Sequence, residues 1–134
     1  DATIVDNQEA LEVDKAVEVS TNMLTAHPDI DAFYGEAGNM VAGAAVAIKQ
    51  ADKVGKVVIF GHDITPTTAD LLIDGSIVKY INAMLAEDFG KTTIDMALDA
   101  INKKPSPGVI YNMTPKDFFS SKPEEVKAWL DAHK

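Results

Sequence analysis

Apolar residues recur along the chain with two spacings, one helical and one extended. Three- and four-residue spacings predict amphipathic helices at about 9–26, 40–50, 66–73, 87–103 and from 123 onward. Short apolar runs predict strands at 3–5, 30–34, 56–60, 77–82 and 109–111. Because strands and helices alternate through short connections, the pattern predicts an α/β fold with three layers around a mostly parallel sheet.

Turn residues mark several ends of these elements. Pro28 ends the first helix, because proline cannot continue the helical hydrogen-bond ladder. Thr65 and Pro66 suit an N-cap and the first helical position, and Gly75 suits the turn that closes the same helix. The run at 56–60 has no polar alternation, which is typical of a strand covered on both faces.

The charge balance narrows the range of partners. All 12 basic residues among 134 are lysines, against 21 acidic residues, and the formal net charge is −9. Such a surface repels phosphate backbones and anionic lipids. The chain also lacks arginine, whose guanidinium group is the usual bidentate donor to phosphate groups. The composition therefore argues against nucleic acids and favours a neutral or cationic small molecule. The chain also has no cysteine, which removes thiol chemistry.

Polar residues gather just after the predicted strands, where an open parallel sheet binds its ligands. The candidate ligand-binding residues are Glu36, Asn39, His62, Asp63 and Asn82. Carboxylates and carboxamides at these places suit the vicinal hydroxyls of a polyhydroxylated ligand. The same residue types are also common turn formers and caps, so position alone leaves both interpretations open.

Several segments together resemble type I periplasmic solute-binding proteins. They are residues 22–33, with the sequence NMLTAHPDIDAF, the Gly43–Ala44 pair, residues 57–63, Thr65–Pro66 and Asp74–Gly75. The resemblance covers about residues 9–104 in order. It implies two similar α/β lobes joined by three crossing strands, with a sugar or related small polar ligand clamped between the lobes. The same fold forms the effector-binding part of lactose-repressor-type regulators.

The resemblance also implies which part of such a protein this chain corresponds to. Residues 1–82 are similar to most of the second lobe and carry the ligand loops. Residues 83–134 are similar to a return helix, the final crossing strand and a C-terminal helix, which would pack on the first lobe. Because the first lobe is missing, we expect a fragment that holds about half of the site and binds ligand poorly by itself.

Each candidate residue has a place in the family pattern. Asp63 matches the aspartate that family members carry after the corresponding strand, and Glu36 and Asn39 follow a strand after which an Asn-Asp or similar pair is usual. Asn82 lies at or beside a position that often holds a ligand-binding Gln or Asn.

Two positions depart from the family pattern. Leu11 and His62 stand where aromatic residues usually stack on a sugar ring, which puts a pyranose or furanose in doubt and leaves a smaller polyol or other polar metabolite.

The implied function is that of the solute-binding component of an ABC-type uptake system, which delivers its ligand to a membrane permease. Such a protein is periplasmic, or extracellular and lipid-anchored, and we expect its signal peptide to lie outside this chain. The resemblance implies neither a cofactor nor catalysis. An effector-binding domain of a lactose-repressor-type transcription regulator, or a sensory receptor domain, remains the alternative.

Other chemistries have less support. His62, Asp63 and Glu36 include only one imidazole, whereas zinc usually takes more nitrogen or sulfur ligands, so we predict no metal site. The Gly-Xaa-Ser-Xaa-Gly elbow of many hydrolases and the Gly-Xaa-Gly-Xaa-Xaa-Gly dinucleotide cradle are both absent from the sequence.

The apolar side of the helix predicted at 87–103 needs a cover, and we expect its large residues to face inward. That side contains Phe89, Ile94, Ala97, Leu98 and Ile101. A large apolar side chain left in water forfeits about 1.5–3 kcal/mol of burial. We therefore expect the helix to fold back on its own sheet or to be covered by a second copy, and we favour the homodimer.

Overall fold

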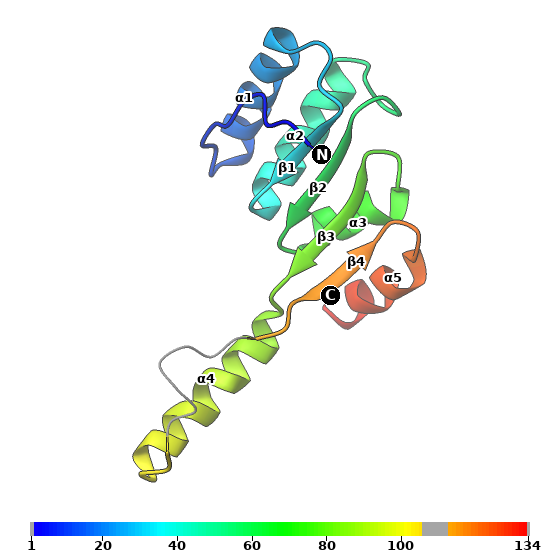
Figure 1. The fold of residues 1–134 in the computed structure, drawn as a ribbon. Coiled ribbons are helices and arrows are strands. Elements are labelled where there is room, and N and C mark those ends of the chain that lie inside the picture. Colours follow the sequence, from blue (N-terminus) through cyan, green and yellow to red (C-terminus); the bar gives the residue numbers. More distant parts are fainter. Residues whose placement is uncertain (1, 106–112, 134) are drawn as a thin grey trace. The chain divides into compact units, whose positions relative to one another are not determined.

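The computed structural model describes residues 2–105 and 113–133, and helices alternate with strands along them (Figure 1). The elements are α1 (Val13–Ala26), β1 (Ala32–Gly35), α2 (Gly38–Gln50), β2 (Val58–His62), α3 (Pro66–Asp74), β3 (Val78–Ala83), α4 (Ala86–Ile101), β4 (Lys116–Phe119) and α5 (Pro123–Ala132). The chain divides into two compact units, one formed by Asp1–Asn82 with Asp117–Lys134, and the other by Ala83–Lys116. Residues 117–134, which we expected to group with 83–116, thus belong to the first unit.

The first unit contains a four-stranded sheet in the order β1-β2-β3-β4. Both β1 with β2 and β2 with β3 pair in parallel. The last pair is antiparallel, because Ser120 N donates to Lys79 O at 3.0 Å while Asn82 Nδ2 reaches Asp117 Oδ1 at 2.7 Å, and Figure 1 shows the two arrows in opposite directions. The predicted α/β class with a mostly parallel sheet is confirmed.

The core of the first unit lies between one face of the sheet and its helices. Ile59, Ile81 and Phe118 point from the strands into this core and are fully buried. Val41 of α2, Ile48 of α2, Leu72 of α3 and Val126 of α5 are buried as well. Phe118 also meets the ring of Trp129 edge-on, with centroids 6.1 Å apart, which seats α5 on β4.

The opposite face of the sheet carries exposed aromatic side chains. Tyr34 and Phe60 are partners in register and are 68% and 40% exposed, and Tyr80 follows as the partner of Phe60. Phe119 of β4 completes this aromatic row, with its ring centroid 5.1 Å from that of Tyr80. The expectation that the strand at 56–60 is covered on both faces is therefore wrong, because the helices that pack on the described part of the sheet lie on the other face.

The ends of α3 agree with the sequence analysis. Thr65 Oγ1 accepts a hydrogen bond from Thr68 N at 3.2 Å, while Thr65 N donates to Thr68 Oγ1 at 2.8 Å, so each residue caps the other. At the other end Gly75 has φ +67°, a left-handed conformation that glycine adopts at little cost. These two ends hold the loop before α3 and the turn before β3 in defined conformations.

Two of the predicted strands differ from the structure. Residues 3–5 are not part of the sheet, and Ile4 remains 86% exposed. The predicted strand at 109–111 lies outside the described residues. The run at 56–60 enters the sheet two residues late, because Val57 N first closes a turn onto Lys53 O at 3.1 Å. Strand β4, in which only Phe118 is buried, was not predicted from the sequence.

The second unit is built on α4, which begins with Glu87 and Asp88 in its first turn. No residue of this helix is buried, and its apolar side chains are 51–75% exposed at Phe89, Ile94, Leu98 and Ile101. The prediction that they face inward is wrong for this chain. An apolar stripe indicates which side of a helix can pack against other protein, but it does not show that a packing partner is present in the same chain. Among the described residues, no helix combines the length and the apolar character needed to cross a bilayer.

Candidate functional site

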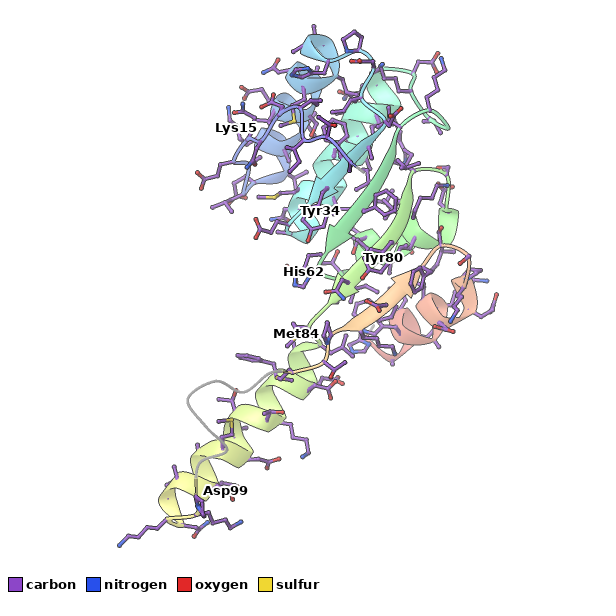
Figure 2. All side chains as sticks on the ribbon, viewed as in Figure 1. Lys15, Tyr34, His62, Tyr80, Met84 and Asp99 are labelled. Carbon is purple, nitrogen blue, oxygen red and sulfur yellow. The ribbon has the colours of Figure 1, made fainter. Side chains whose placement is uncertain are left out.

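Two of the predicted ligand residues lie at or next to the last position of neighbouring strands and are partners in register. His62 is the last residue of β2 and pairs in register with Asn82 of β3. Both are half-buried, and both follow an aromatic-row residue by two positions, so they share the face of the sheet that carries this row. Figure 2 shows His62 and Tyr80 on this part of the sheet. We call the end of the strands at which they lie the carboxyl edge.

Asp63 follows His62 in a fixed loop conformation. Its φ is +68°, and its N–H donates to Asn82 O at 3.0 Å, which extends the pairing of β2 with β3 by one residue. Its own carbonyl oxygen accepts a hydrogen bond from Thr68 Oγ1 at 3.3 Å. The carboxylate is half exposed, and its Oδ1 lies 3.4 Å from His62 Nε2. The loop thus holds a carboxylate and an imidazole together beside Asn82.

Asp117, which is not among the predicted ligand residues, completes this arrangement. Asp117 of β4 accepts hydrogen bonds at Oδ1 from Tyr80 Oη at 2.8 Å and from Asn82 Nδ2 at 2.7 Å. The hydrogen bond from Asn82, followed by that from Tyr80, lowers the pKa of Asp117. The hydrogen bond that the Tyr80 hydroxyl donates to Asp117 raises the pKa of Tyr80, and burial is the second cause of this rise.

Within the described residues, the remaining two candidates make no hydrogen bond to this group. Asn39 Nδ2 donates to Leu11 O at 3.2 Å, so its amide holds the segment before α1. Glu36 comes one residue after Gly35, the partner of Gly61, so its backbone reaches the carboxyl edge next to β2. Its side chain is exposed and has no hydrogen bond or ion pair within the described part of the chain. The structure therefore groups His62, Asp63 and Asn82, and adds Asp117 and Tyr80.

One hollow of the first unit lies beside α1. It has a volume of about 210 Å³ and is lined by Asp6, Gln8, Val19, Asn22, Met23 and Ala26. Asp6 Oδ1 is already occupied by hydrogen bonds from Asn7 N and Gln8 Nε2, at 2.7 and 3.0 Å. The hollow belongs to the packing of the N-terminal segment on α1 rather than to the carboxyl edge.

The chemistry of the carboxyl edge is that of hydrogen bonding. Asp63 supplies acceptors, Asn82 supplies one acceptor and one further N–H, and His62 supplies either, depending on its tautomer. Within the described residues, no three His, Asp or Glu side chains form a group that could hold a metal ion. The arrangement suits a ligand with several hydroxyl groups, each of which can donate one hydrogen bond and accept others.

Comparisons with known proteins identify the class to which this fold and this edge belong. Residues 1–105 match the family described as periplasmic binding protein domain. The chain belongs to this family, which confirms the resemblance found in the sequence.

The individual relatives come from transport systems. The ABC transporter periplasmic-binding protein YphF of Escherichia coli (strain K12) is 32% identical over 98% of this chain and 40% of its own length. The D-allose-binding periplasmic protein of the same organism is 34% identical over 64% of this chain and 27% of its own length. This chain therefore spans well under half the length of these relatives.

Solved structures agree with the fold. An ABC transporter periplasmic solute-binding protein from Actinobacillus succinogenes 130z, solved with bound D-allose, superposes with a TM-score of 0.79. It is 29% identical, and the match covers 85% of this chain and 39% of that protein. These family members are solute-binding transport proteins and not enzymes.

Proposed function

We propose that this chain forms one side of the ligand cleft of a solute-binding protein for a sugar or related polyol, in an ABC-type uptake system. The observation that carries the proposal is the grouping of His62, Asp63 and Asn82 at the carboxyl edge, on a fold that matches sugar-binding transport proteins. The relatives whose names state a ligand are named for D-allose and ribose.

The chemistry of the edge agrees with a neutral polyhydroxylated ligand. The chain has no arginine and a net charge of −9, and both disfavour anionic ligands. Asp63 and Asn82 offer acceptors and a donor to neighbouring hydroxyls. Leu11 is not aromatic and is 63% exposed, so it offers no stacking platform for a sugar ring. A polyol or a small sugar therefore fits better than a large pyranoside.

The proposal includes the cellular setting. The protein acts in the periplasm, or outside the cell on a lipid anchor, and hands its ligand to a membrane permease without chemical change. It needs no cofactor for this role. A lactose-repressor-type effector domain is a less suitable alternative, because the relatives named here are transport proteins.

A binding experiment on the complete 134-residue chain tests the ligand class. We expect D-allose, D-ribose or myo-inositol, added at millimolar concentration to ¹⁵N-labelled chain, to shift the amide signals of His62, Asp63 and Asn82. Binding should be weak, because one side of a cleft leaves the ligand open to water. The D-allose-binding relative from E. coli serves as positive control. Shifts confined to α1, or none with any ligand of the panel, would contradict the proposal.

We also propose that two copies of the chain associate through the apolar side of α4. Ile94 and Leu98 are 62% and 51% exposed on this side, and burying them against a second copy removes them from water. Light scattering at micromolar concentration should give the mass of a dimer, and Leu98→Lys should shift it to that of a monomer. Thr92→Lys, on the polar side of the same helix, is the matched control. A wild-type monomer at this concentration would refute the dimer.

A further inference from the structure

Asp117 lies beside the proposed ligand residues without being one of them. It comes from β4, 35 residues after Asn82 in the chain, and the bond from Ser120 N to Lys79 O holds the two strands together. One of its oxygens accepts both the Tyr80 hydroxyl at 2.8 Å and the Asn82 amide at 2.7 Å. Both distances lie within the ordinary range for hydrogen bonds.

The hydrogen bond to Asp117 fixes which way round the Asn82 carboxamide lies. A carboxamide has an oxygen on one side and an NH₂ group on the other, so turning it by half a circle exchanges acceptor and donors. An ionised carboxylate accepts only, and a turned amide would bring its oxygen against that of Asp117. Asn82 is therefore held with its nitrogen towards β4 and its oxygen directed away from Asp117.

Tyr80 limits the freedom of the carboxylate itself. Its hydroxyl donates to the same oxygen of Asp117 from the same face of β3, two residues before Asn82. The Tyr80 ring is in turn held against Phe119, with centroids 5.1 Å apart. The aromatic row thus anchors the carboxylate that orients the amide.

We propose that Asp117 is a positioning residue, which fixes the Asn82 amide so that its oxygen accepts a hydrogen bond from a ligand hydroxyl. This inference rests on the proposed function, because it assigns a ligand contact to Asn82. It adds a preference within the ligand class: a ligand needs a hydroxyl hydrogen, and not a bare acceptor such as a ring or ether oxygen, opposite the Asn82 oxygen.

The orientation of the amide is tested first, by NMR on the ¹⁵N-labelled 134-residue chain. In the wild type, the side-chain NH₂ signals of Asn82 should titrate together with Asp117 in acid. In Asp117→Asn they should lose this titration and move towards the positions of free amides, since an asparagine at 117 can both donate and accept. Asp70→Asn, an equal charge change on the exposed side of α3, is the control and should leave the signals unchanged. Asn82 signals that do not follow Asp117, or that are equal in all three proteins, would overturn the inference.

The effect on the ligand is tested second, with D-allose at millimolar concentration. Loss of one oriented hydrogen bond should weaken binding about fivefold in Asp117→Asn, and Asp70→Asn should bind as the wild type does. Equal binding by wild type and Asp117→Asn would overturn the positioning role. If the wild type binds no ligand of the panel, the proposed function fails, whereas the orientation of Asn82 is still decided by the first experiment.

Discussion

At the scale of single residues, the ionisation of Asp117 is tied to two hydrogen-bond donors on the neighbouring strand. Its pKa is lowered, mainly by the bond from Asn82 and then by that from Tyr80. The pKa of Tyr80 is raised, mainly by the bond to Asp117. The stability of the β3–β4 pair should therefore depend on pH in two ranges, an acidic one in which Asp117 is protonated and an alkaline one in which Tyr80 loses its proton.

We predict that Asp117 stabilises the fold above its ordinary pKa of 3.8 and that this contribution is lost as the pH falls through its lower folded value. At the alkaline end, the Tyr80 bond contributes below the ordinary pKa of 10.0 and is lost as the pH rises through the raised folded value. Urea unfolding of wild type and Asp117→Asn should differ most near neutrality and converge in strong acid. A gap that stays constant from neutrality into strong acid would contradict this assignment.

At the scale of elements, α1 and α2 approach each other closely at one glycine. A Cβ built on Gly43 would lie 2.4 Å from Ala16 Cβ and 2.8 Å from Val13 O. Such contacts cannot form without moving one helix, because both partners belong to α1 and one is backbone. The small-residue sequence of α2 is therefore required by its neighbour and not by the helix alone.

Gly43→Ala should lower the free energy of unfolding by about 1–3 kcal/mol, since overpacking outweighs the better helix propensity of alanine. Gly90→Ala is the matched control, because Gly90 lies in α4 and a Cβ there meets no atom within 4 Å. It should raise the stability of its helix by up to about 1 kcal/mol. Urea unfolding followed by circular dichroism measures both, and a stabilised Gly43→Ala would mean that the two helices are not held as described.

The elements also show what the sequence could predict. Strands β1, β2 and β3 were found to within about two residues, because each is an apolar run bounded by turn residues. Strand β4 was missed because only Phe118 of its four residues is buried, which leaves no pattern to detect. Asp117 went unselected for the same reason. Asn39 was predicted as a ligand residue, and in the structure its amide donates a hydrogen bond to Leu11 O. The two residues are 28 positions apart, so no local sequence pattern could predict this contact.

At the scale of the whole molecule, the chain leaves apolar surface uncovered in both of its units. The aromatic row crosses all four strands of the first unit, and the apolar side of α4 is exposed in the second. In a family whose named relatives are more than twice as long as this chain, such surfaces are where further protein can pack. Both surfaces are therefore places at which further protein could pack.

The charge of the whole molecule leads to a prediction about ligand binding. The net charge of −9 would make the binding of any charged ligand depend strongly on ionic strength. A neutral polyol releases no counterions, so its affinity for the chain should change less than twofold between about 50 and 500 mM NaCl. NMR titration at both salt concentrations measures this. A polyol affinity that falls steeply with salt would contradict this prediction.

The single tryptophan has a consequence for how this protein can be observed. Trp129 lies in α5 against Phe118, on the face of the sheet opposite to the one that carries His62 and Asn82. Its fluorescence should therefore report whether α5 is seated on β4, and it should change in one step when that contact opens. Adding a sugar at the carboxyl edge should leave the emission unchanged. A silent fluorescence titration would thus carry no information about binding, whereas a tryptophan introduced at Tyr34, on the open face, would place a reporter on the side that carries His62 and Asn82.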